Sequence, residues 1–152
     1  MSKKITLIFL FIVLNKTLML SQNLFPEKYV GCSTESFSLE MDTVRAKINV
    51  QDFIKTIFQN VSEKTKNKIE GELFLQILVD LEGKSCLISL ENKTNIKTKR
   101  LNLKETIDNK IMWSKPKEMV SPVIILRMKS KQVFFSRWGM NGNTGWHEIN
   151  KT

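Results

Sequence analysis

The chain has 152 residues, of which 41% are hydrophobic and 26% are charged, and its formal net charge at pH 7 is +9. This length corresponds to one domain with a short additional segment, and the composition excludes a chain that is disordered throughout. Two cysteines and one histidine cannot supply the ligands of a structural zinc site.

Residues 1–21 have the layout of a secretory signal peptide, with two lysines near the start and an apolar run over residues 5–14. The run is about half of the ~20 residues needed to cross a bilayer. Small Ser21 predicts cleavage after this position. We therefore expect an exported protein, periplasmic or secreted. The alternative is an uncleaved anchor over residues 5–20 that holds the protein at the inner membrane.

The remaining positive charge is distributed along the chain. Removal of residues 1–21 takes away three lysines and no acid, which lowers the net charge from +9 to +6. The basic run at residues 93–100 contains no aromatic residues for base stacking, so we expect no nucleic-acid partner. A solvated basic surface is the simplest interpretation, and weak contact with an anionic membrane or cell wall is the alternative.

The two cysteines, Cys32 and Cys86, predict one disulfide if the protein enters an oxidising compartment. The bond would tie an irregular lead-in, residues 22–47, to the second predicted strand. In the alternative interpretation both thiols are unpaired, and Cys86 is an apolar strand residue.

The first predicted helix covers residues 49–61, with Asn49 as its N-cap. Its apolar residues recur at helical spacing and form one stripe. The members of the stripe are Val50, Phe53, Ile54, Ile57, Phe58 and Val61.

A strand, a tight turn and a second strand follow at residues 70–80, 81–84 and 85–90. Strict alternation predicts that one face of the first strand lies in the core, and Gly83 can adopt the positive φ of the turn. That face carries Leu73, Leu75, Ile77 and Val79. In the second strand, alternation places Cys86, Ile88 and Leu90 on one face.

The second predicted helix covers residues 102–113, with Asn102 and Glu105 at capping-box spacing. We expect Trp113 to be a core residue at the helix end, with Pro116 as the stop. Residues 120–135 form the last strand or pair of strands. In the tail, residues 137–152, an Asn-Gly pair between aromatic residues predicts a hairpin or a loosely packed end.

No catalytic or cofactor-binding pattern is found in the sequence. A histidine-dependent mechanism would have to use His147, the single histidine, which lies in the glycine-rich tail and is predicted to face solvent. We therefore predict a protein that is not an enzyme and needs no cofactor. A cell-wall hydrolase that uses His147 is the alternative.

The stretch from Lys68 to Lys84 resembles the opening of the C-terminal domain of TonB energy transducers. It has an Ile-Glu-Gly start, an apolar strand that closes in Val79-Asp80, and a hairpin glycine. Trp113-Ser114-Lys115-Pro116 is similar to the Trp-x-Pro of that family with one residue inserted. The resemblance covers about residues 45–136, without the Pro-rich spacer of the family.

The resemblance implies an α+β fold, a two-layer sandwich in which two helices pack on one face of a three-stranded antiparallel sheet. It implies a binding domain at residues 48–136, followed by the tail at 137–152. In this family the last strand captures an extended segment of a receptor by strand addition. The residues expected to bind an outer-membrane receptor or periplasmic protein are therefore Val123, Ile125 and Arg127.

Two alternatives stay open at this point. The strand at 120–128 could instead be core, with its edge covered by the tail. A structural or inhibitory protein of the same fold could also act through the tail, between Trp138 and Trp146. The oligomeric state is not predicted.

Overall fold

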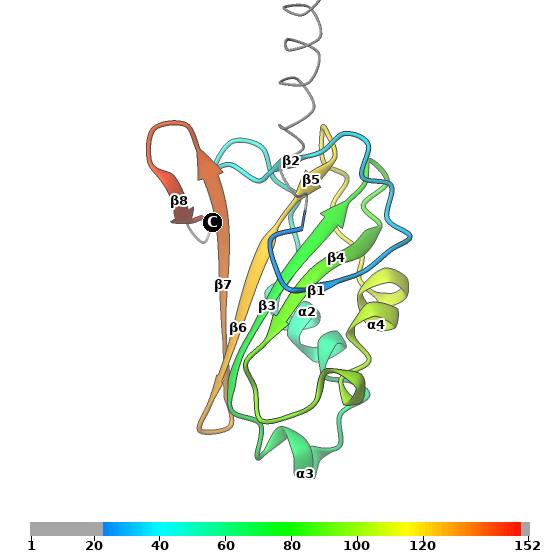
Figure 1. Ribbon diagram of the computed structural model, residues 1–152, viewed down its shortest axis with the longest axis vertical. Coiled ribbons are helices and arrows are strands. Elements are labelled where there is room, and N and C mark those ends of the chain that lie inside the picture. The colour runs from blue at the N-terminus through cyan, green and yellow to red at the C-terminus, as the bar shows by residue number, and fades with distance from the viewer. Residues whose placement is uncertain (1–22, 150–152) are drawn as a thin grey trace, which may run out of the picture.

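The computed structural model of the protein describes residues 23–149. One antiparallel sheet dominates it, in the strand order β1-β4-β3-β6-β7-β8 (Figure 1). Off this path, β2 pairs in parallel with β5, and β5 pairs with β3. The strands are β1 (Glu27–Lys28), β2 (Ser38–Leu39), β3 (Gly71–Val79), β4 (Ser85–Asn92), β5 (Val120–Ser121), β6 (Val123–Lys129), β7 (Gln132–Asn141) and β8 (Gly145–Glu148).

The helices are short, and in Figure 1 α2 lies behind the sheet and α4 lies beside β4. They are α2 (Val50–Ile57), α3 (Glu63–Lys66) and α4 (Leu103–Lys110), with one 3-10 turn, η1 (Thr98–Arg100). The predicted fold, a three-stranded sheet with two helices, is therefore wrong. The sheet has eight strands within residues 23–149, and three α-helices accompany it. Three of the eight strands, β1, β2 and β5, have two residues each, which is too short to produce a periodic pattern.

The first helix begins where the sequence predicts. The side chain of Asn49 accepts a hydrogen bond from the backbone N–H of Asp52 at 3.0 Å. The helix ends earlier than predicted, at Ile57, and α3 follows as a separate polar turn. At the other helix Asn102 has a left-handed φ of 47° and makes no capping bond, so the predicted capping box is wrong.

The core lies between the helices and the sheet. The four predicted core residues of β3 are all 0% exposed, which confirms the alternation there. In β4 the pairing register shifts opposite Gln76 and Ile77, so that Leu87 and Leu90 both join the core cluster while Ile88 does not. A β-bulge of this kind breaks the period-2 rule, and the predicted face of β4 is therefore wrong.

Trp113 is a core residue, as predicted. It is 5% exposed and meets the ring of Phe53 edge-on, at 6.0 Å between centroids. Its backbone N–H donates to the carbonyl of Gly83 at 2.8 Å, and Gly83 has the positive φ, 82°, that the turn needs. The chain segment after α4 is thereby fixed to the β3–β4 turn.

The lead-in crosses the helix-free face and reaches the outer edge of β4. There β1 pairs with Ser89 and Leu90, and the backbone N–H of Tyr29 donates to the carbonyl of Ile88. The predicted disulfide between Cys32 and Cys86 is present and holds this segment in place. The predicted signal peptide lies outside the described residues, and no helix within residues 23–149 has the length and apolar character to cross a membrane.

Candidate protein-binding groove

The strand predicted to offer a free edge, β6, lies inside the sheet. It pairs with β3 from Val123 to Met128 on one side and with β7 from Val123 to Lys129 on the other. The prediction that Val123, Ile125 and Arg127 form an edge is therefore wrong. The physical reason is a hairpin turn at Ser130 and Lys131, whose positive φ values let the chain fold back along β6.

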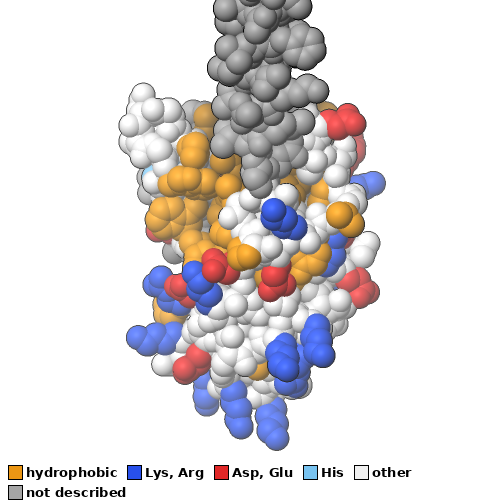
Figure 2. All heavy atoms as spheres, viewed as in Figure 1, with side chains coloured by type: hydrophobic (Ala, Val, Ile, Leu, Met, Phe, Trp, Pro, Cys, Tyr) orange, Lys and Arg blue, Asp and Glu red, His pale blue; other side chains and the backbone are white. Residues whose placement is uncertain are grey.

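The side chains of these three residues point to the face without helices, and their surroundings differ. Val123 is buried, Ile125 is half-buried, and exposed Arg127 pairs with Glu72 at 2.6 Å. Val123 and Ile125 help to line a shallow apolar hollow of about 310 Å³. Its other lining residues are Leu24, Phe25, Phe74, Trp138 and Trp146. Figure 2 shows apolar side chains gathered in the upper part of this face, with Lys and Arg gathered below.

The free edge of the sheet belongs to β7. Its inner side pairs with β6, while its outer side pairs with β8 only from Trp138 onward. Lys129 and Gln132 flank a two-residue turn, so Gln132 and every second residue after it direct their N–H and C=O groups toward β6. Val133 and Phe135 lie between these positions, and their backbone N–H and C=O groups therefore point outward, away from β6. No strand among residues 23–149 pairs with β7 at these two positions.

A groove runs between this edge and α2, with a volume of about 630 Å³. Its residues are Arg45, Lys47, Ile48, Val50, Gln51, Ile54, Val133, Phe134, Phe135, Arg137, Glu148 and Ile149. A second hollow of about 270 Å³ shares Ile54 and Val133 with the first. It adds Lys55, Phe58, Glu63, Lys66, Asn67, Ile69, Met128, Lys131 and Gln132. We call the two together the α2–β7 groove.

A buried ion pair holds one end of the groove in shape. The Arg137 guanidinium donates to the carboxylate of Glu40 and to the carbonyl of Ala46, while the Ala46 N–H donates to Glu40 at 2.9 Å. Burial raises the pKa of Glu40, and hydrogen bonds and charge from Arg137 act against that rise. Arg137 also lies over the ring of Trp113 at 5.2 Å. The loop before α2 and the strand β7 are thus joined at one point.

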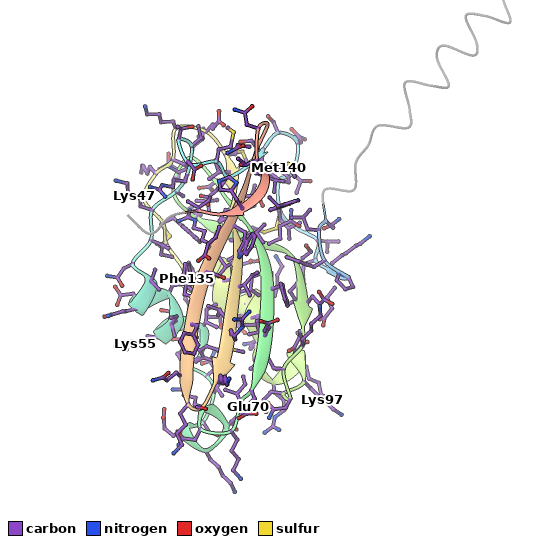
Figure 3. The ribbon with its side chains drawn as sticks, turned by 90° about the vertical axis from the view of Figure 1, so that its left-hand side faces the viewer. Lys47, Lys55, Glu70, Lys97, Phe135 and Met140 are labelled. Carbon is purple, nitrogen blue, oxygen red and sulfur yellow. A yellow bond between two sulfur atoms is a disulfide. The ribbon has the colours of Figure 1, made fainter. Side chains whose placement is uncertain are left out.

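The middle of the groove is formed by Ile54 and Val133, which line both hollows, with Phe135 beside them. The Phe135 ring contacts Phe53 of α2 edge-on, at 5.8 Å between centroids, and both Val133 and Phe135 are only partly buried. The backbone of β7 is therefore supported from the core side and open at its outer side. Figure 3 shows Phe135 on β7, facing the viewer between the levels of Lys47 and Lys55.

His147 lies on β8, outside the groove. Its Nε2 is 2.9 Å from a carboxylate oxygen of Asp42, and its Nδ1 is 3.1 Å from the Gly145 carbonyl. These contacts raise the pKa of His147, the Gly145 hydrogen bond most. The Thr144 hydroxyl is 3.4 Å from Nδ1 but bonds Asn141 at 2.8 Å. Because a carbonyl can only accept, Nδ1 carries a proton that it donates to Gly145. Nδ1 therefore cannot act as a base toward the Thr144 hydroxyl.

Comparison of the chain with protein-family models, with curated proteins and with solved structures finds no match. Among residues 23–149 no cluster of three or more His, Cys, Asp or Glu side chains could hold a metal ion. The groove, the free edge and the charges around them are therefore the features of the molecule that indicate a function.

Sequence reasoning missed the β7 edge for an identifiable reason. The turn residues Ser130 and Lys131 lack the Asn-Gly or Asp-Gly signature that usually marks a two-residue hairpin. The break in apolar residues at 129–132 was the available signal, and it supported the interpretation of a pair of strands.

Proposed function

We propose that the protein is an exported protein-binding module that takes up an extended segment of a partner at the free edge of β7. The observation that carries the proposal is the pair of outward-facing backbone positions, Val133 and Phe135, bordered by the α2–β7 groove. Backbone hydrogen bonds to an added strand would supply affinity, and side chains entering the groove would supply selectivity.

The resemblance to TonB C-terminal domains contributes the mode of binding to this proposal, because strand addition is what the resemblance implies. It contributes nothing to the position, since the family expectation pointed to β6. A partner in the periplasm or outer membrane is part of the same proposal and depends on export of the chain.

A photo-crosslinking experiment in the host tests the proposal. We replace Gln51, an exposed groove residue of α2, with p-benzoylphenylalanine, and use Leu81, which is 52% exposed at the β3–β4 turn, as the matched control position. We expect an adduct from position 51 and none from position 81.

The edge is tested by combining position 51 with Val133→Pro. Proline removes an outward N–H that β6 does not use, and an edge strand tolerates it there. We expect the adduct to disappear in Val133→Pro and to remain in Val133→Ala, which shortens the side chain without removing the N–H. Equal crosslinking in the two variants would falsify strand addition at β7.

A second candidate is contact through the apolar hollow on the helix-free face. The observation that favours it is exposed apolar surface beside the hollow, with Trp146 41%, Leu24 40% and Met140 37% exposed. Exposed apolar patches with a polar rim often mark interaction sites. If this candidate is right, p-benzoylphenylalanine at Met140 gives an adduct and the same residue at position 51 gives none. The control position is Met112, which is 61% exposed.

A further inference from the structure

The charges along the α2–β7 groove are unequal. Six basic residues and two acidic residues line it. The basic residues are Arg45, Lys47, Lys55, Lys66, Lys131 and Arg137, and the acidic residues are Glu63 and Glu148. An extended segment bound here would therefore lie in a positive field.

Some of these charges already have partners. Arg137 is bound to buried Glu40, Lys66 pairs with Glu63 at 2.7 Å, and Arg45 also has a partner. Within the described part of the chain, no ion pair is found for Lys47, Lys55 or Lys131. These three lysines are the charges that a ligand can still neutralise.

The three lysines are spread along the groove. Lys47 precedes α2, exposed Lys55 lies in its last turn, and Lys131 occupies the β6–β7 turn. In Figure 3 Lys47 and Lys55 lie on the α2 side of the groove, one on either side of the level of Phe135. From Lys47 to Lys55 the chain can advance by at most roughly 17 Å, in three extended and five helical steps. A strand covers that distance in about five residues.

We infer that the segment taken up by β7 is acidic, with two carboxylates four residues apart and an apolar side chain midway between them. This inference rests on the proposed function, because the spacing of the two acids requires a bound segment whose side chains alternate between two faces, as they do in a strand. Residues i, i+2 and i+4 of an added strand face the same side. On the α2 side the two acids reach Lys47 and Lys55, and the middle residue enters the apolar part formed by Ile54, Val133 and Phe135.

Synthetic peptides test this inference on the full-length exported protein, with fluorescence anisotropy as the readout. The probe is a nine-residue peptide of alternating threonine and valine, with aspartate at its third and seventh positions and isoleucine at its fifth. Matched peptides carry asparagine or lysine in place of both aspartates. We expect the aspartate peptide to bind at least tenfold more tightly than the asparagine peptide. The lysine peptide should not bind. Equal affinities, or no binding by any peptide, would overturn the inference.

Charge reversal in the protein gives the second arm. The double variant Lys47→Glu, Lys55→Glu is expected to bind the aspartate peptide at least tenfold more weakly than the wild type does. It should bind the lysine peptide more tightly than the wild type does. The control is Lys84→Glu, Lys110→Glu, two exposed lysines at the β3–β4 turn and at the end of α4, which should change neither affinity.

The Val133→Pro variant separates this inference from the proposed function. If proline abolishes binding while charge reversal leaves the peptide preference unchanged, strand addition stands and the acidic preference is wrong. If charge reversal weakens binding while proline has no effect, acidic peptides bind without adding a strand, and the proposed function is wrong.

Discussion

At the scale of single residues, the shape of the groove depends most on the ion pair of Glu40 and Arg137. The Glu40 side chain is fully buried and that of Arg137 is 12% exposed, so both charges are largely shielded from water. Removal of one partner of such a pair typically costs about 3–5 kcal/mol, because the other charge stays buried and unpaired.

We therefore expect Glu40→Leu to lower the free energy of unfolding by about 3–5 kcal/mol, measured by urea denaturation. The double variant Glu40→Leu, Arg137→Met should recover part of the loss, since no buried charge is left alone, although the Ala46 N–H and carbonyl lose these partners. Glu72→Leu is the control. It breaks the exposed pair with Arg127 and should cost about 0–1 kcal/mol. A similar loss in both single variants would contradict the argument.

Gly83 is required by the contact between the β3–β4 turn and Trp113. It has a φ of +82°, and a Cβ there would lie 2.3 Å from the Trp113 carbonyl oxygen. We expect Gly83→Ala to destabilise the protein by about 1–3 kcal/mol or more, in thermal or urea unfolding. Gly142→Ala is the matched control, because a Cβ at that position meets nothing within 4 Å. A small effect at both positions would show that the turn can relax.

At the scale of elements, the lead-in depends on one covalent bond. The disulfide closes a loop with a sequence separation of 54, and such a constraint is worth about 4 kcal/mol in the chain-entropy model. We expect the double variant Cys32→Ser, Cys86→Ser to lose up to that amount. We also expect faster tryptic cleavage after Lys28, because this segment is then held to β4 by two residue pairs and the Tyr29–Ile88 hydrogen bond, without a covalent link. Unchanged cleavage would mean that the strand pairing is sufficient on its own.

The attachment of β8 depends on pH through His147. Its pKa is raised in the folded protein by the Gly145 carbonyl and by Asp42. The stabilisation is therefore complete below the ordinary value of 6.5 and is lost as the pH rises through the folded pKa. We expect Asp42→Asn to lower the pKa of His147, measured by NMR titration of the single histidine ring. The stability difference between this variant and the wild type should shrink from pH 5.5 to pH 8.5. Asp52→Asn, on α2, should leave the titration unchanged.

At the scale of the whole molecule, residues 137–148 belong to the sheet. They complete β7 and form β8, and Arg137 is the first residue of that segment. A chain that ends after Ser136 leaves buried Glu40 without its partner, and we expect it to lose cooperative thermal unfolding. A chain that ends after Asn141 keeps the ion pair and should still unfold cooperatively, at a lower temperature. Equal behaviour of the two truncations would contradict this account.

The sequence predicted the parts of the fold that follow from a pattern of neighbouring residues. The buried face of β3, the N-cap of α2 and the glycine of the β3–β4 turn follow from local patterns. The bulge in β4 and the pairs β1–β4 and β2–β5 have no such pattern, because long-range pairing decides them. The candidate site was misplaced by one strand, since the hairpin at Ser130 and Lys131 has unusual turn residues.

The coverage of the β4 edge by β1 has a consequence for self-association. A sheet with two open edges can polymerise into a filament, whereas a sheet with one open edge can pair only once. Because the disulfide holds β1 across Ile88, Ser89 and Leu90, this part of the β4 edge is covered and cannot pair with a second copy. Reduction of that bond removes the covalent constraint on β1, and the β4 edge is then covered only by the hydrogen bonds of β1 and Tyr29.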